Sequence, residues 1–463
     1  MSTTTAAPPK PRAVFTQGSL ARHVLVMTAT GSIGLMAVFA VDLLSILYIS
    51  WLGDPALTAG VGYATQITFL VMSVNIGMSI GVGAVVSRAI GAGDRALARR
   101  LSASGLVHSF VLSEAVGLLV LPFRAELLEV LGARGETLDA ASGFLAITLP
   151  FAGVMALGMT FSGVLRAVGD AKRAMYLTLF GAIVTAVVDP VLILGLGLGA
   201  EGAAITTDLS RLVWVGVGAW GAVRVHSLVA FPRRAFVIED IRPVFAVAGP
   251  AMMTNIAAPI ASLYSVKVMS QFGAPALAAG SIIDRIVPVA FGPLFAMSGV
   301  VGPIVGQNFG AGLLGRVRST LTSCFIFAAL YVAAAWALLF LASPEIVRLF
   351  SARGETADLV LFFCYWGAAA WAFLGCLFAA NAAFNNLGYA KLSMAFNWGR
   401  ATLGFMPFVT LGAHLFGAKG VILGAIGGAG LFGAGSIVCA YWLIGRLERP
   451  ALANKSALEI KMS

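Results

Sequence analysis

Hydrophobic residues form long runs separated by short polar connections, and these runs predict the fold. A membrane-spanning helix needs about 20 apolar residues, and twelve runs approach or exceed that length. The runs lack the alternating polarity of barrel strands, so we expect an all-α integral membrane protein. The expected spans are 22–48, 56–85, 101–122, 140–165, 174–196, 202–224, 244–270, 275–303, 319–342, 357–384, 392–414 and 419–445.

Composition and charge agree with a membrane location. The 463 residues are 59% hydrophobic and only 11% charged, which is too apolar for an ordinary soluble protein. The net charge is +10, and the basic residues gather on alternate connections. The positive-inside rule then predicts a multi-pass protein of the inner (plasma) membrane with both termini cytoplasmic. The basic charge therefore indicates orientation, and we expect no nucleic-acid partner.

An internal repeat divides the chain into two similar halves. LGDPALTAG at 52–60 returns as FGAPALAAG at 272–280, and ARGET at 133–137 returns unchanged at 352–356. The offset of about 219 residues corresponds to six spans, so the halves keep the same orientation and are parallel lobes. We expect a cytoplasmic tail (1–21), an N-lobe (22–224), a cytoplasmic linker (225–243), a C-lobe (244–445) and a second cytoplasmic tail (446–463).

Two aspartates inside apolar runs are the strongest functional candidates. Asp42 in the first span and Asp189 in the fifth lie at similar distances from the outer ends of spans that run in the same direction. An intramembrane carboxylate costs roughly 2.5–3.5 kcal/mol unless it has a partner, a hydrated cavity or a function. Thr185 shares the helical face of Asp189, and the sixth span brings Thr206 and Thr207 to comparable depth. We predict a proton-binding or substrate-binding cluster; the alternative is that each aspartate only bonds a neighbouring helix.

Other intramembrane charges favour structural roles. Asp208 and Arg211 have the spacing of a local helical ion pair, and we also expect Asp284 and Arg285 to neutralise each other. Lys267 lies near the outer end of its span, where it can snorkel to the interface or attract an anion.

The sequence gives little support for an enzyme or for a resident cofactor. The chain contains no G-x-x-x-x-G-K-[ST] loop, its four histidines are scattered, and its four cysteines occur singly in apolar runs. We expect no catalytic residue, no metal site and no cofactor.

Three motifs resemble those of one transporter family. VSRAIGAGD at 86–94, PIVGQNFGAG at 303–312 and LRAVGD at 165–170 accompany the twelve spans and two parallel lobes. Together they resemble the multidrug and toxic compound extrusion (MATE) family over nearly the whole chain. Within that family, the sequence looks most like the branch related to the DNA-damage-inducible protein F.

The resemblance implies a set of site residues. That branch has an aspartate in the first span, an Asn-x-x-x-Asp pair in the fifth and a threonine in the sixth. These positions map onto Asp42, Thr185, Asp189 and Thr207, with threonine at 185 where the branch commonly has asparagine. Sodium-coupled relatives hold a carboxylate in the seventh span, which here has Asn255 instead of an acid among its main polar residues. Asn255, Lys267 and Asp284 are secondary candidates, with Thr206.

These features favour a secondary antiporter that exports amphipathic, often cationic, organic compounds in exchange for protons. Its partners would be small organic substrates and the lipid bilayer, and we expect a monomer. The alternatives are a sodium-coupled exporter of the same family, a lipid or lipid-linked sugar flippase of the wider superfamily, and a channel or membrane-embedded enzyme.

Overall fold

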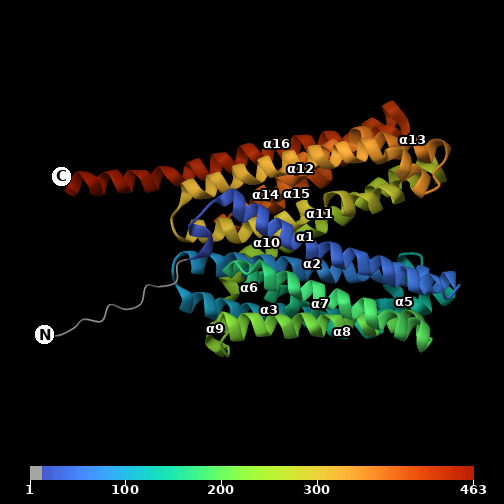
Figure 1. Ribbon diagram of the computed structural model, residues 1–463, viewed down its shortest axis with the longest axis horizontal. Coiled ribbons are helices and arrows are strands. Elements are labelled where there is room, and N and C mark those ends of the chain that lie inside the picture. The colour runs from blue at the N-terminus through green and yellow to red at the C-terminus, as the bar shows by residue number, and fades with distance from the viewer. Residues whose placement is uncertain (1–12, 463) are drawn as a thin grey trace.

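The computed structural model describes residues 13–462, which form a long helical bundle with both ends of the described chain on the same side (Figure 1). We call that side the terminal end and the other side the opposite end. The first half of the chain contains helices α1 (Leu20–Ser50), α2 (Pro55–Gly91), α3 (Arg95–Val120), α4 (Arg124–Val130), α5 (Gly135–Thr148), α6 (Ala152–Val168), α7 (Ala171–Asp189) and α8 (Gly199–Ala219). A short α9 (Arg234–Glu239) follows, and the second half contains α10 (Ile241–Met269), α11 (Ala274–Gly310), α12 (Leu314–Leu349), α13 (Gly354–Phe362), α14 (Trp371–Leu387), α15 (Ala390–Gly399) and α16 (Met406–Met462).

Helices cover all of the expected spans, although one of the units described next contains two of them. Ten units of the described chain are long and apolar enough to cross a membrane. The last unit, Ala390–Arg449, contains two expected spans joined at Gly417, where a φ of 60° lets the chain turn back on itself. The remaining expected span is α8, which is outside those ten and carries the charged residues Asp208 and Arg211. The prediction of an all-α membrane protein with twelve spans is confirmed.

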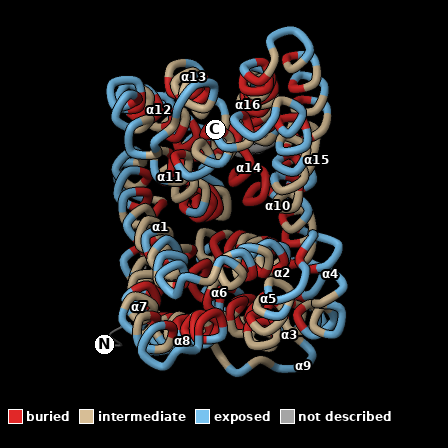
Figure 2. The backbone as a smooth tube through the Cα atoms, turned by 90° about the vertical axis from the view of Figure 1, so that its right-hand side faces the viewer, coloured by how far each residue is buried: buried red, intermediate tan, exposed pale blue. Residues whose placement is uncertain are grey.

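The chain forms two lobes, each with its own apolar interior. α1–α8 make the N-lobe and α10–α16 make the C-lobe, and in Figure 2 the two groups lie one above the other with buried segments inside each. One hydrophobic cluster lies mainly within the C-lobe, while two others belong mainly to the N-lobe. α9 lies in the connection between the lobes, at the terminal end (Figure 1).

The lobes meet closely in the half of the bundle nearer the terminal end. Gly81 of α2 lies so near α10 that an added Cβ would stand 2.6 Å from the Ala248 Cβ. On α11, a Cβ at Gly310 would stand 2.9 Å from the carbonyl carbon of Arg88. Small residues allow such close approach between membrane helices. Toward the opposite end the helices of the two lobes diverge (Figure 1).

Candidate functional site

Asp189 is a buried carboxylate at the point where a helix changes its geometry. It is the last residue of α7, and Pro190–Gly195 continues as a π-helical turn. Proline lacks a backbone N–H, so the regular α-helical bonding pattern cannot continue unchanged through this turn. Asp189 is 1% exposed, and its Oδ1 atom has no hydrogen-bond partner in the described part of the chain. An ionised oxygen in that position would be costly, so it is suited to receiving a proton or a ligand donor.

The other carboxylate oxygen connects Asp189 to α1. The Ser45 hydroxyl of α1 donates a hydrogen bond to Asp189 Oδ2. Asp42 lies one helical turn before Ser45, is exposed, and is close enough to Asp189 for their charges to interact. The structure therefore brings the two predicted aspartates together. Sequence reasoning missed Ser45, although its i+3 spacing from Asp42 placed it on nearly the same helical face.

The predicted threonines lie on α7 and α8, and each hydroxyl donates a hydrogen bond to a carbonyl of its own helix. Thr185 donates to the Gly181 carbonyl at 3.1 Å, Thr206 to that of Gly202 at 3.0 Å, and Thr207 to that of Ala203 at 2.8 Å. These are bonds to the preceding turn of their own helices, which serine and threonine commonly form. Of the three, Thr206 is the one that is buried.

Apart from Thr206, which lies on α8, the secondary candidates lie in the C-lobe and do not join the cluster. Asn255 donates to the Ala251 carbonyl of its own helix at 2.8 Å, while Lys267 and Asp284 are exposed. The predicted pairing of Asp284 with Arg285 is wrong, since no ion pair joins them within residues 13–449. Neighbouring residues project about 100° apart on an α-helix, which separates their charged groups.

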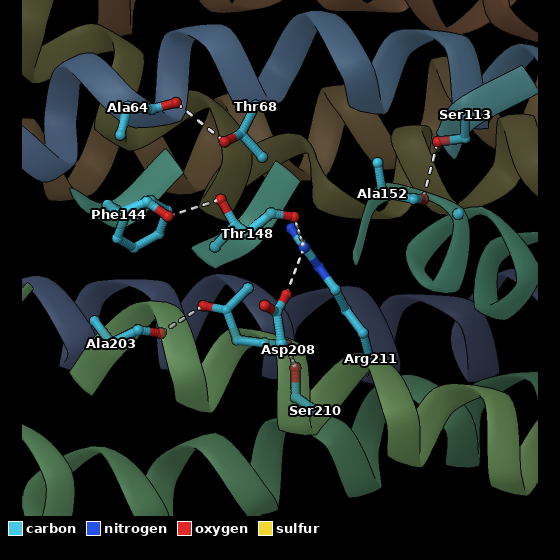
Figure 3. A network of polar contacts seen from close by, with 12 residues as sticks. Ala64, Thr68, Ser113, Phe144, Thr148, Ala152, Ala203, Asp208, Ser210 and Arg211 are labelled. Atoms are coloured by element: carbon cyan, nitrogen blue, oxygen red, sulfur yellow. Dashed lines mark hydrogen bonds and ion pairs between the residues drawn. The ribbon is translucent and has the colours of Figure 1, made fainter. Parts of the chain in front are cut away.

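The predicted pairing of Asp208 with Arg211 is confirmed. Figure 3 shows the two side chains between α8 and its neighbours, with Arg211 Nη1 2.7 Å from Asp208 Oδ1 and 3.0 Å from the Thr148 carbonyl oxygen. Both side chains are nearly fully buried, at 6% and 7% exposed, and Asp208 Oδ2 lacks a partner in the described chain. This pair holds α8 against the end of α5.

A second carboxylate, Asp170, caps α7 at its other end. It lies outside the membrane spans and accepts hydrogen bonds from the Arg173 backbone at 3.1 Å, from the Arg173 guanidinium, and from His226 at 2.7 Å. Burial alone would raise the pKa of Asp170, but these hydrogen bonds outweigh it and hold that pKa below its ordinary value. Asp170 therefore remains ionised and joins α7 to the segment that follows α8.

Comparison with known proteins places these helices in one group of transporters. Residues 32–191 and 250–410 match the sequence profile of the family described as MatE. A protein described as an FAD transporter of Shewanella oneidensis is 26% identical over 412 residues, covering 87% of this chain and 90% of that protein. The multidrug export protein MepA of Staphylococcus aureus is 23% identical over 428 residues, covering 90% of this chain and 92% of that protein.

Solved structures show the same fold. An outward-facing multidrug resistance MATE transporter of the MOP superfamily superimposes with a TM-score of 0.89 at 21% identity, covering 96% of this chain and all of that chain. A mutant of the Vibrio cholerae MATE transporter VcmN gives a TM-score of 0.88 at 22% identity, covering 92% of this chain and 97% of that chain. The likeness extends over both lobes.

Proposed function

Because this chain belongs to the MatE family of multidrug-type membrane transporters, we propose that it exports amphipathic organic compounds, often cations, in exchange for protons. In this proposal the protein is a monomer in the inner membrane. The terminal end faces the cytoplasm, as the distribution of basic residues suggests. The divergence of the lobes at the opposite end then corresponds to an outward-facing state (Figure 1).

The observation that carries the proposal is the carboxylate pair between α1 and α7. Asp189 is buried with one unpartnered oxygen, and the exposed Asp42 lies within electrostatic range of it. Two carboxylates in an apolar bundle do not both ionise freely, so one of them is suited to binding a proton near neutral pH. Such a pair can hold either a proton or an organic cation.

The expected cycle follows from that competition. In the outward-facing state, protonation of the pair weakens its attraction for a cation and releases the substrate. After the lobes open toward the cytoplasm, loss of the proton restores the negative charge and substrate binding. Each proton that returns supplies about 2.3 kcal/mol per 100 mV of membrane potential and about 1.4 kcal/mol per pH unit.

Proteoliposomes loaded with a pH-sensitive dye test this coupling. Addition of ethidium should cause proton release from wild type, and Asp42→Asn and Asp189→Asn should each reduce it at least tenfold. Asp54→Asn is the matched control, because Asp54 is the N-cap of α2, and asparagine can also cap a helix. Unchanged exchange in both Asp42→Asn and Asp189→Asn would refute the assignment.

The same vesicles distinguish proton from sodium coupling. α10 carries no carboxylate along Ile241–Met269, where sodium-coupled relatives are expected to have one. We therefore expect uptake to follow an imposed pH gradient and to be unaffected when the sodium gradient is collapsed. Uptake that follows sodium alone would favour the sodium-coupled alternative.

A second candidate substrate is an anionic aromatic molecule such as a flavin nucleotide. The relative from Shewanella oneidensis is described as an FAD transporter. In this chain Arg166 donates a hydrogen bond to Ser162 at 2.8 Å and forms no ion pair with an acid in the described chain. Arg166 also lies near the C-lobe, because a Cβ on Gly299 would stand 3.9 Å from the Arg166 Nε atom. An unneutralised guanidinium between the lobes can attract a phosphate group. Flux of FAD in the same vesicles, lost in Arg166→Met and retained in Asp42→Asn, would favour this substrate.

A further inference from the structure

A short segment before the first span is packed between the two lobes at the terminal end. Residues 13–18, which we call the N-terminal latch, contain a turn of 3-10 helix at Val14–Thr16. The Phe15 ring is 1% exposed and belongs to the C-lobe hydrophobic cluster. On the N-lobe side, a Cβ on Gly169 would lie 3.2 Å from the Val14 side chain and 3.4 Å from the Phe15 ring. The latch therefore contacts both lobes.

Gln307 of α11 joins the latch to both lobes through a single amide group. Its Oε1 atom accepts a hydrogen bond from the Phe15 backbone N–H at 2.9 Å. Its Nε2 atom donates to the Ala167 carbonyl of α6, in the N-lobe, at 2.7 Å. Gln307 is fully buried. Separation of the lobes at this end would break the bond from Gln307 to its N-lobe acceptor, so this bond stabilises only the arrangement in which the lobes touch.

Two further C-lobe residues fix the backbone of the latch. Asn308 Nδ2 donates to the Phe15 carbonyl at 3.1 Å, and Arg316 Nη2 donates to the same carbonyl at 3.0 Å. Arg316 also reaches the carbonyls of Gln17 at 3.3 Å and Gly18 at 3.1 Å. Arg316 Nε is in turn held by Asn308 Oδ1 at 3.0 Å. These bonds hold the latch on the C-lobe, with Phe15 directed toward the end of α6.

We propose that Phe15 and Gln307 are positioning residues of the transport cycle, which hold the lobes closed at the terminal end and release them when that end opens. The proposal rests on the alternating opening described above. The contacts to Ala167 and Gly169 belong to the N-lobe, and those to Gln307, Asn308 and Arg316 belong to the C-lobe. The contacts to the N-lobe and to the C-lobe can form together only while the two lobes touch at this end. The latch therefore stabilises the state in which the terminal end is closed.

Distances between spin labels across the terminal end test the latch without any transport measurement. The labels are attached at Ala96→Cys in the N-lobe and Ser319→Cys in the C-lobe, which are both exposed sites, in a protein without the four native cysteines. The distance between the labels reports how far apart the two lobes are at the terminal end. Wild type should give one short distance. Phe15→Ala and Gln307→Leu should each add a longer distance, with at least a tenfold rise in the fraction of open molecules. Gln17→Ala is the matched control, because its exposed side chain takes no part in these bonds.

The outcomes separate a positioning role from simple structural support. If the variants unfold at lower temperature while the label distance stays as in wild type, the proposal is wrong. If both variants remain monodisperse and show the longer distance, it is supported. The result does not depend on the transported ion or compound, so a failure of proton coupling and a failure of the latch are distinguishable.

Discussion

Replacing Arg211 by methionine should strongly destabilise the N-lobe, because it isolates a buried carboxylate. Arg211 Nη1 lies 2.7 Å from Asp208 Oδ1, and the two side chains are only 7% and 6% exposed. Asp208 Oδ2 already lacks a partner in the described chain, so Arg211→Met leaves neither oxygen with its cation. The Thr148 carbonyl also loses the donor that lies 3.0 Å away.

The expected loss of stability follows from measurements on buried ion pairs in general. Removing one partner of such a pair typically costs about 3–5 kcal/mol. At about 2.1 cal/mol/K of unfolding entropy per residue, a chain of this length changes its melting temperature by about 1 °C per kcal/mol. The Arg211→Met variant should therefore unfold about 3–5 °C below wild type. Thermal unfolding in detergent, monitored by intrinsic fluorescence, measures this difference.

Removing both charges should restore most of that loss. The double variant Asp208→Leu with Arg211→Met leaves no isolated charge, and such replacements are often neutral or stabilising. The matched control is Arg285→Met, because Arg285 is exposed and forms no ion pair in the described chain; it should lie within about 0.5 kcal/mol of wild type. A double variant as unstable as Arg211→Met would refute the reasoning, since loss of packing and not the isolated charge would then be responsible.

Three further predictions concern other sites. Gly81→Val should prevent the close approach of α2 to α10 and abolish transport in folded protein, whereas Gly62→Val, where an added Cβ meets nothing within 4 Å, should transport like wild type. Ser45→Ala should weaken ethidium exchange about tenfold or more, because a hydrogen bond to a charged group contributes about 1.5–3 kcal/mol; Ser50→Ala, whose hydroxyl bonds its own helix, should not. Asp170→Ala should lower the melting temperature at pH 7. Because the folded pKa of Asp170 is depressed, that difference should persist above the unfolded pKa of about 3.9 and disappear as the pH falls through the folded pKa.

The spans could be predicted from sequence because the bilayer imposes a length and a polarity on each of them. The turn between the last two spans falls at Gly417, between the expected ends 414 and 419, and only its positive φ of 60° is a local backbone property that hydropathy does not indicate. The N-terminal tail was also incompletely predicted. Positions 1–12 of the expected tail 1–21 lie outside the described residues, but residues 13–18 of that tail dock on a buried glutamine.

The candidate site was predicted only in part, because a sequence pattern indicates position along a helix but not the hydrogen-bond partners of a side chain. Periodicity and topology placed Asp42 and Asp189 at similar depth, and in the structure Ser45, three residues after Asp42, donates a hydrogen bond to Asp189. Periodicity indicates a face but not a hydrogen-bond partner, so Thr185 was expected to support Asp189, yet it donates to its own helix. Ser45 supplies a bond to Asp189 across two helices, and the rotation of α1 against α7 that permits it is set by packing of the whole lobe.

The contacts between the lobes have a common chemical character that bears on how they separate. Every ion pair of the described side chains lies within one lobe or between the N-lobe and the linker. The lobes are instead joined by amide and hydroxyl hydrogen bonds, such as Gln307 to Ala167 and Ser87 to Asn386 at 3.1 Å, and by glycine contacts. Separating neutral groups avoids the large cost of leaving an unpaired charge in a medium of low dielectric constant. In the proposed cycle, a change in the ionisation of Asp42 and Asp189 would therefore act from inside one lobe, because no ion pair between the lobes has to be broken first among the described side chains.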